Sequence, residues 1–411
     1  MRPTTPLSQG EFIALMAALI ATVSFSIDAM LPVLPQIAQE LSPGSPNNAQ
    51  LILTSFVMGM GIGTLFAGPI SDATGRKVVI LGGVAIYIVG AILAIFAPTL
   101  ETLLAARLLQ GLGAAGPRIV STAMIRDRFE GRRMAQIMSF VMTIFILVPA
   151  VAPFIGSLVI NAFGWRAIFV AFVIFALIGA VWMSLRQPET LAPAARRPLA
   201  VGALRSAMSE VMGHRTVRIY IAVLTLGAGQ MFALLSSIQQ LFGETFGRAE
   251  NFPLWFMGMA LISGTSTILN ARLVMRIGMR RLAISAYGTQ TLLSALFLIA
   301  GVSGLMPAAL AFPAFLFWAV SVFFMVGMTF GNLNALALEP MGHIAGMAAS
   351  VVGAISTVLA VLIAVPIGLA FDGTPLPLMA GTLICSALAW WLMRKSREAD
   401  PAPRIIPPEM G

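Results

Sequence analysis

Three ionisable residues stand inside long apolar stretches of this sequence: Asp28, Arg107 and Arg118. A charge inside a membrane helix is costly, so such a residue is a functional candidate by default. A carboxyl group in a poorly hydrated cavity binds a proton near neutral pH, because desolvation favours its neutral form, whereas a nearby arginine favours the charged form. If the distance between an acid and an arginine changes, the proton affinity of the acid changes with it. The acid would then bind a proton in one arrangement and release it in the other.

The positions of these residues predict how they meet. Asp28 lies roughly 8 Å, and Arg107 roughly 9 Å, inside the outer ends of their predicted helices at 1.5 Å per residue, so the two can pair if both helices line the central cavity. Arg107 and Arg118 are eleven residues apart, within about 20° of each other on an ideal helix. We expect Asp28 to carry a proton, Arg107 to tune and orient it, and Arg118 to shape the deeper cavity or bind an electronegative solute group.

Two alternative roles stay open for these side chains. Asp28 can be a static partner that only neutralises Arg107. Arg118 can snorkel toward water or bond backbone carbonyls as a structural residue. Substitution of Asp28 by asparagine separates the first alternative from proton coupling.

The elements that must position these residues are membrane helices. The chain has 411 residues, of which 58% are hydrophobic and only 10% are charged, against about a quarter in soluble domains. The apolar residues form blocks, many of which reach the ~20 residues that cross a bilayer. We predict an all-α membrane protein with twelve helices, at 12–33, 49–70, 78–98, 102–125, 134–161, 166–186, 217–241, 252–273, 281–304, 308–333, 343–370 and 376–394.

The basic residues predict the orientation of these helices, because lysine and arginine gather on the cytoplasmic side. With the N-terminus inside, most of the 25 basic residues fall in cytoplasmic segments, and the outer loops hold only Arg166 and Arg248. The net charge of +9 then reflects topology, and we expect no nucleic-acid partner. We predict a multi-pass monomer in the bacterial inner membrane, in contact with the lipid bilayer and with both termini cytoplasmic.

The twelve predicted helices divide into two sets of six, which predicts a protein built from two similar halves. We expect an N-terminal six-helix bundle at 1–186, a cytoplasmic linker at 187–216, a C-terminal six-helix bundle at 217–394 and a tail at 395–411. In the linker, Leu199, Leu204, Met208 and Met212 recur with polar residues between them, which indicates an amphipathic helix.

The segment from Gly68 to Lys77 joins the second and third predicted helices. Its glycines, Gly68 and Gly75, allow a tight turn, and Asp72 and Arg76 can pair with each other or with neighbouring helix ends. Such a charge latch would hold one face closed in one state and release it in another. The alternative is a plain basic loop that anchors the topology.

This segment resembles the signature loop of the major facilitator superfamily. Two further segments agree: residues 107–115 resemble the fourth-helix motif of that superfamily, and residues 149–157 resemble the fifth-helix motif of its antiporters. The second match keeps Pro149, Pro153 and Gly156, but Ala152 and Ser157 stand where glycine is usual. The resemblance implies a fold of two six-helix bundles, with Pro149 and Pro153 bending a helix that helps the halves rock.

Within that superfamily, the chain resembles the Bcr/CflA (bicyclomycin/chloramphenicol-resistance) subfamily of drug exporters. The segments that carry this resemblance are 27–35, 124–127 with Arg126 and Asp127, 138–142, and 338–346. The resemblance implies proton-coupled efflux of small amphiphilic compounds or drugs by alternating access. It implies no cofactor, with the proton as the coupling ion.

Neutral and adaptable side chains are expected to complete a substrate cavity around Arg118. They are Gln110, Met30, Met142, Gln230, Met231, Phe232 and Gln239. Amides can bind a neutral or zwitterionic solute, or can bond other helices, and methionine repacks easily. Both roles stay open for each amide.

Other function classes find little support in the residues. An importer or facilitator on the same fold is the main alternative, because signature loops do not fix direction. An enzyme would need clustered carboxylates, histidines or a nucleophile with its base, and we expect none, nor a metal site. A single cysteine, Cys385, excludes an internal disulfide, and no loop is long enough for the sensory domain of a receptor.

Overall fold

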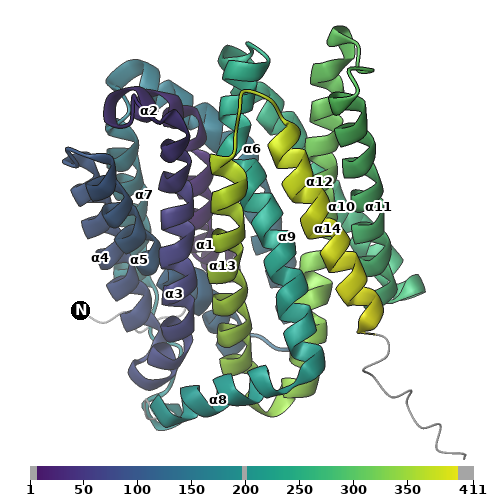
Figure 1. The fold of residues 1–411 in the computed structure, drawn as a ribbon. Helices are drawn as coiled ribbons and strands as arrows, with labels where there is room; N and C mark the ends of the chain where they lie inside the picture. Colours follow the sequence, from purple (N-terminus) through teal and green to yellow (C-terminus); the bar gives the residue numbers. More distant parts are fainter. Residues whose placement is uncertain (1–6, 197–200, 397–411) are drawn as a thin grey trace, which may run out of the picture.

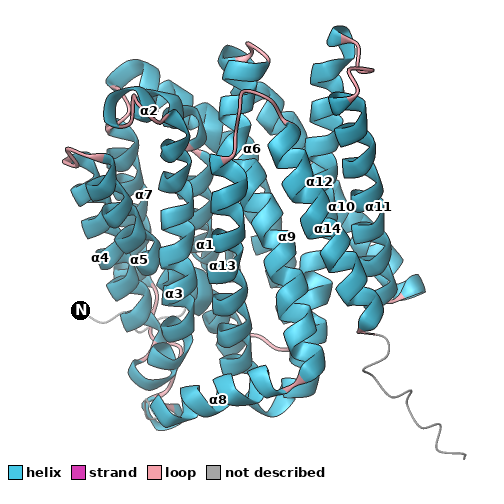
Figure 2. Ribbon diagram, in the orientation of Figure 1, coloured by secondary structure: helices cyan, strands magenta, loops and turns pink. Residues whose placement is uncertain are grey.

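A computed structural model of the chain describes residues 7–196 and 201–396, with the backbone alone at a few positions, Met142 among them. Every regular element in these ranges is a helix, as Figure 2 shows. The N-terminal helices are α1 (Gln9–Asp28), α2 (Leu34–Leu41), α3 (Leu51–Thr74), α4 (Arg76–Ile95), α5 (Leu100–Arg128), α6 (Gly131–Phe163) and α7 (Ala167–Arg186). The linker helix α8 (Val201–Gly213) precedes α9 (Arg215–Gln240), α10 (Phe252–Ile277), α11 (Met279–Val302), α12 (Ala308–Leu338), α13 (Ala345–Leu369) and α14 (Leu376–Lys395).

A helix of at least 20 residues lies at each of the twelve predicted spans. By length and composition, nine stretches of the described chain can cross a membrane, and one of them, Ala308–Leu369, contains both α12 and α13. The predicted all-α membrane architecture is confirmed.

The first predicted span ends earlier than expected. Helix α1 stops at Asp28, and a 3₁₀ turn at Leu31–Val33 leads into α2. Pro32 and Pro35 account for this break, because proline has no backbone N–H to continue the helical bonds. Asp28 is therefore the last residue of its helix rather than an interior one.

Close backbone contacts join helices within and between the two sets. In the N-terminal set, a Cβ atom at Gly59 of α3 would lie 1.9 Å from the carbonyl oxygen of Leu108 in α5. Small residues of this kind let helix backbones approach in a membrane. Helix α3 also packs against α13, and α6 against α10, so these pairs connect the N-terminal helices (α1–α7) to the C-terminal helices (α9–α14).

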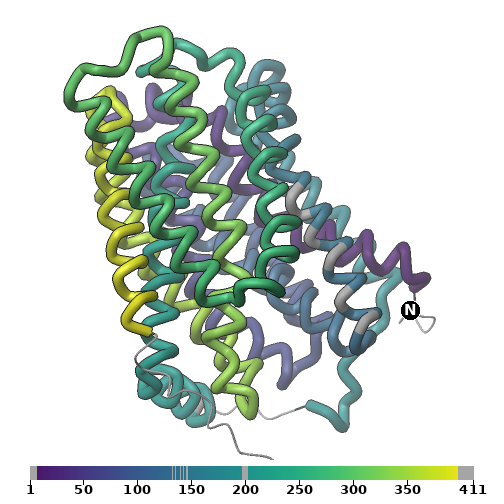
Figure 3. The backbone as a smooth tube through the Cα atoms, turned by 90° about the vertical axis from the view of Figure 1, so that its right-hand side faces the viewer, coloured from purple at the N-terminus to yellow at the C-terminus, as the bar shows by residue number. Residues whose placement is uncertain are grey.

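The two ends of the bundle differ. Helix α8 crosses one end, called the α8 end here, and α1 starts and α14 finishes toward it (Figure 1). The opposite, or far, end carries α2 and the connection from α13 to α14. Seen from the side, the N-terminal and C-terminal helices spread apart toward the α8 end (Figure 3).

The sequence predicts an amphipathic helix in the linker, and α8 is that helix. Leu204 and Met208 pack against the apolar cluster of the C-terminal helices, and Val211 is fully buried. Met212 is 39% exposed, so its predicted place on the apolar face is wrong. Leu199 lies outside the described residues.

Candidate functional site

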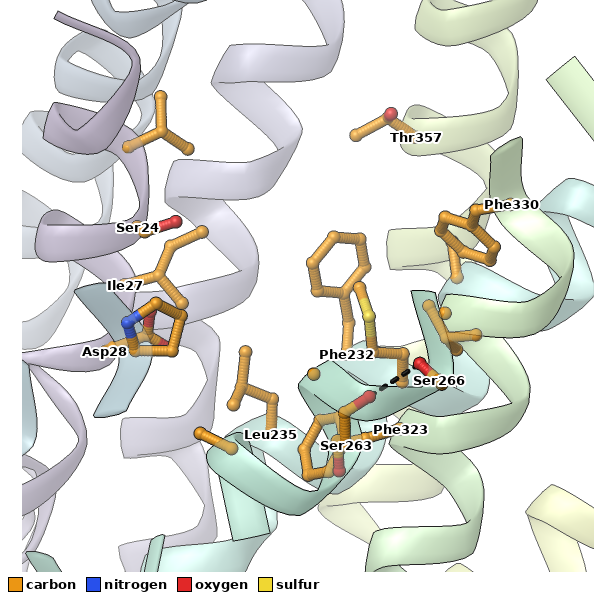
Figure 4. A pocket seen from close by; sticks show the side chains of 18 of the residues that line it. Ser24, Ile27, Asp28, Phe232, Leu235, Ser263, Ser266, Phe323, Phe330 and Thr357 are labelled. Carbon is orange, nitrogen blue, oxygen red and sulfur yellow. Dashed lines mark hydrogen bonds between the residues drawn. The ribbon is translucent and has the colours of Figure 1, made fainter. Parts of the chain in front are cut away.

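A cavity of about 460 Å³ lies between the N-terminal and C-terminal helices. Its wall is formed by residues of α1, α3, α5, α6, α9, α10, α12 and α13. Most of the lining is apolar, and Met231 and Phe232 belong to it as the sequence predicts. Figure 4 shows Asp28 and Ser24 on the α1 side, with Phe232, Phe323 and Phe330 across the cavity.

Asp28 is the only acidic residue among those that line this cavity. Its side chain is 5% exposed. Among the side chains that the structure describes, none forms a hydrogen bond or an ion pair with its carboxyl group. A carboxyl group in an apolar wall without a fixed partner can bind either a proton or a polar group of a solute.

Arg107 does not meet Asp28 in the expected way. Its fully buried guanidinium donates to Gln110 Oε1 at 2.7 Å, to the carbonyl oxygen of Ser26 at 3.1 Å and to that of Ile52 at 3.3 Å. The described chain contains no Asp28–Arg107 ion pair, so the predicted direct pair is absent from this conformation.

The reason lies in the end of helix α1. The last carbonyls of a helix lack intrahelical partners and carry partial negative charge, which a cation stabilises. The carbonyl of Ser26, two residues before Asp28, receives the Arg107 guanidinium. The other side of that guanidinium lies over the Phe56 ring, with 4.4 Å between its central carbon and the ring centroid. Arg107 thus contacts the helix end that carries Asp28 through a backbone carbonyl and not through the carboxyl group.

A second contact fixes the same helix end and was not identified from the sequence. The hydroxyls of Ser26 and Tyr87 lie 2.5 Å apart, and Ser26 also donates to the Thr22 carbonyl at 2.6 Å. Tyr87 comes from α4, so α4 and α5 both hold the last turn of α1. Single hydroxyl residues inside apolar helices are too common for this pair to be singled out by pattern.

Arg118 lines the cavity that contains Asp28. Its Nη1 atom lies 3.5 Å from the sulfur of Met60, and no carboxylate of the described chain is within ion-pair distance. Because a thioether is a weak acceptor, most of the five guanidinium N–H donors remain available to a solute. The cavity thus holds one acid and one guanidinium, from α1 and α5.

Four of the predicted cavity residues do not line this cavity in the conformation described. Gln110 accepts from Arg107, Gln230 accepts from the Ser386 hydroxyl at 2.8 Å, and Met30 and Gln239 are buried between helices. The bonds of Gln110 and Gln230 connect residues of the bundle, which agrees with the alternative role left open for the amides. The side chain of Met142 lies outside the description. The polar lining comes instead from Ser24, Ser263, Ser266, Thr267, Asn334, Ser356 and Thr357.

The loop between α3 and α4 forms an ion cluster at the α8 end. Arg76 pairs with Asp72 and with Asp127 of α5, whose Oδ2 atom lies 2.9 Å from Arg76 Nε. Gly75, with a φ of 114°, makes the turn that only glycine adopts readily. Asp127 also accepts from the hydroxyl of Thr190 at 3.0 Å. The predicted pairing of Asp72 with Arg76 is confirmed.

Glu189 completes this cluster and was missed in the sequence. Its carboxylate accepts from the backbone N–H groups of Arg76 and Lys77, each at 3.0 Å, at the start of α4. A carboxylate is favourable at a helix N-terminus. A cavity of about 600 Å³ adjoins the cluster, and its lining includes Gly68, Arg126 and the first turns of α13.

The fifth-helix motif lies beside Asp28. Pro149 of α6 lines the central cavity, and Pro153 is buried. A Cβ atom at Gly156 would lie 2.3 Å from the carbonyl oxygen of Ala29. Gly156 therefore allows α6 to pack directly on the residue that follows Asp28.

Uncharged side chains join the two sets of helices at the far end. Asn47 donates to the carbonyl oxygens of Leu369, at 3.2 Å, and Phe371, at 2.8 Å. Gln240 donates to Asn47 at 2.8 Å and accepts from Gln50 at 2.9 Å. This amide network connects the N-terminal helices to the C-terminal helices at the far end.

Comparison with known proteins places this architecture in a family. The family model described as Major Facilitator Superfamily matches residues 14–365. A bicyclomycin resistance protein homolog of Haemophilus influenzae is 29% identical over 394 residues, covering 93% of this chain and 96% of that one. The multidrug resistance protein MdtL of Escherichia coli (strain K12) is 30% identical over 348 residues, covering 84% of each chain.

Solved structures agree on the fold. A D-xylose–proton symporter superimposes with a TM-score of 0.71 at 15% identity, covering 93% of this chain and 97% of the other. The human organic anion transporter MFSD10 gives a TM-score of 0.64 at 17% identity, covering 94% and 100%. At such identities the likeness shows the fold alone. Since the family model spans most of the sequence, the chain is a multi-pass transporter of small molecules rather than an enzyme, and it belongs to the Major Facilitator Superfamily.

Proposed function

We propose that this protein exports small amphiphilic compounds across the bacterial inner membrane in exchange for protons, acting as a monomer with Asp28 as the proton carrier. One observation carries the proposal. The Asp28 carboxyl stands without a fixed partner in a mostly apolar cavity that also contains Arg118. A proton and a polar group of a solute would compete for the same carboxyl, which is the requirement for exchange.

Basic residues support an orientation with the α8 end in the cytoplasm. Arg76, Arg126 and Arg186 stand near helix termini on that side, and cytoplasmic segments are rich in lysine and arginine. The far end then faces outward, closed by the amide network, and the helices spread toward the cytoplasm. In this proposal the conformation is inward-facing, and the bundles 1–186 and 217–394 rock about the cavity.

The coupling step follows from the ends of helices α1 and α5. When the cavity faces the cytoplasm, Asp28 releases its proton there and an amphiphilic solute takes its place, with Arg118 available to an electronegative group of that solute. Arg107 holds the Ser26 carbonyl, so a shift of α5 relative to α1 would move Asp28 with respect to water and its apolar neighbours. Such a shift changes the proton affinity of the carboxyl in the outward-facing state.

The cavity lining supports an amphiphilic cargo. Phe232, Phe323, Phe330 and Met231 offer apolar contact, and methionine adapts to solutes of different shape. One acid, one guanidinium and several hydroxyls suit neutral, zwitterionic or weakly anionic compounds better than multivalent cations. The names of the relatives, a bicyclomycin resistance protein homolog and a multidrug resistance protein, favour drugs as the cargo and export as the direction.

The first test measures transport of labelled chloramphenicol into inside-out membrane vesicles whose interior is acidified. We expect accumulation by the wild-type protein and at least a tenfold loss for Asp28→Asn, since one titratable group carries the proton. Exchange of labelled for unlabelled drug should persist in this variant. Glu250→Gln, an exposed acid outside the cavity, is the matched control and should accumulate normally.

Two results would contradict the proposal. Proton-driven accumulation by Asp28→Asn at the wild-type rate would remove Asp28 as the carrier. Uptake by right-side-out vesicles without exchange for protons would favour the importer or facilitator. Bicyclomycin, a sulfonamide, a siderophore and an amino-acid derivative extend the test to the cargo class.

A further inference from the structure

A second apolar cavity, of about 750 Å³, lies among α10, α11 and α12. We call it the lateral groove. Its lining includes side chains that are exposed on the outer surface of the bundle, such as Ile262 at 55% and Phe317 at 58%. In a membrane protein such a surface faces lipid, so the groove is reached from the bilayer.

Helix α10 separates the lateral groove from the central cavity. Ser263 and Thr267 of α10 line the central cavity, whereas Gly258 and Ile262 line the groove. Met259 lines both. The Met259 side chain therefore contacts both a lipid-accessible space and the space that contains Asp28, and methionine changes rotamer at low cost.

One polar atom in the lateral groove has no partner. Gln290 of α11 is 1% exposed and lines the groove. Its Nε2 donates to the hydroxyl of Ser294 at 3.2 Å, and that hydroxyl also accepts from the Trp318 indole at 3.1 Å. The Gln290 Oε1 atom is buried with no hydrogen-bond donor in the described chain. Buried acceptors of this kind are costly unless a donor reaches them.

The depth of Gln290 narrows the choice of occupant. It lies eleven residues into α11, roughly 16 Å along the helix at 1.5 Å per residue, which is near the middle of a core about 30 Å thick. Lipid acyl chains have no hydrogen-bond donor at that depth. The groove is lined mainly by apolar side chains, and its other polar residues are Ser285, Thr289 and Ser321. Because the hydroxyls of Ser285 and Ser321 already donate to carbonyls of their own helices, water would find few free polar partners there.

We propose that the lateral groove is a second binding site for an uncharged amphiphile that donates one hydrogen bond to Gln290 Oε1. The site holds cargo that enters from the bilayer, and rotation of Met259 opens the way to the central cavity. The entry route rests on the proposed function, whereas binding at Gln290 does not.

The test uses photolabelling of the full chain in phosphatidylcholine vesicles without a proton gradient. The probe is an alkylphenol that carries a diazirine on its chain, and the reference is its methyl ether, which lacks the donor. We expect the phenol to label α11 and α12 residues of the groove about fivefold more than the ether, the value of one net hydrogen bond. Gln290→Leu should remove this preference.

Matched variants make the result decisive. Gln230→Leu removes a fully buried amide that lines neither space and should keep the preference. Equal labelling by phenol and ether, or an unchanged preference in Gln290→Leu, would overturn the site and leave a lipid-filled groove. A transport measurement tests the entry route separately from binding at Gln290. Met259→Trp should slow drug accumulation at least tenfold while groove labelling persists. Wild-type accumulation by that variant would overturn the entry route alone.

Discussion

At the scale of single residues, the sequence identifies the important charges but not their partners. Asp28, Arg107 and Arg118 stand out because they interrupt apolar helices. Their depth along a helix follows from residue counts, but the direction of each side chain depends on local geometry. An ideal helix places Arg107 and Arg118 within about 20° of each other. Nevertheless, Arg107 bonds carbonyls of α1 and α3, whereas Arg118 lines the cavity.

Arg107→Lys tests whether Arg107 positions Asp28. Lysine keeps the charge but lacks the planar fork that reaches two carbonyls and an amide at once. We expect the maximal rate of proton-coupled drug accumulation to fall at least tenfold, while drug affinity, measured by equilibrium binding, changes less than about twofold. Arg118→Lys is the counterpart inside the cavity and should weaken drug affinity instead. Loss of binding with an intact rate in Arg107→Lys would contradict the positioning role.

At the scale of elements, hydropathy and prolines predict most of what is observed. Each of the twelve apolar blocks is a helix, because an apolar segment in lipid must satisfy its backbone groups internally. The early end of α1 follows from Pro32 and Pro35, and the amphipathic repeat of the linker predicts α8. Close approaches between helices are harder to predict, because the chain has 38 glycines and nothing in a single sequence tells which of them meets a neighbouring backbone.

Gly156→Ala tests the contact between α6 and the end of α1. The added Cβ atom would lie 2.3 Å from the Ala29 carbonyl oxygen, so the backbones must separate, at a cost of about 1–3 kcal/mol. We expect a lower melting temperature in detergent and reduced drug accumulation. Gly82→Ala in α4, where a Cβ atom meets nothing within 4 Å, should melt at or above the wild-type temperature, since alanine favours helix. Equal melting of the two variants would show that α6 adjusts freely.

At the scale of the whole molecule, the six-plus-six architecture is predicted by the number of apolar blocks, but the contacts that close one end are not. Asn47 meets the carbonyl of Phe371, more than three hundred residues later in the chain. The sequence contains many glutamines and asparagines whose side chains can form such bonds, and only the packing of α3 against α13 selects these partners. These long-range pairs join the N-terminal and C-terminal helices at the far end, and no local pattern in the sequence reveals them.

The amide network predicts how the equilibrium between states responds to substitution. Asn47→Ala removes the bonds to the carbonyls of Leu369 and Phe371 and the bond from Gln240. At about 1 kcal/mol net for each of these three hydrogen bonds, the far end should open more often, by a factor on the order of 100. Spin labels at Gly44→Cys and Glu250→Cys, in a Cys385→Ala background, report the separation of the two sets of helices there.

A second substitution at the same end separates this effect from a general loosening. Among the described residues, the Ser42 hydroxyl bonds within its own segment alone, to the Ser45 carbonyl at 2.7 Å, so Ser42→Ala should leave the distance distribution unchanged. Asn47→Ala should instead add a population with a longer distance between the labels. If its distribution matches that of Ser42→Ala, apolar packing of α3 on α13 closes the far end and the amides only fill it. A longer-distance population would show that hydrogen bonds between uncharged groups hold the closed state. Because these groups do not titrate, a change in proton concentration would not directly alter the bonds.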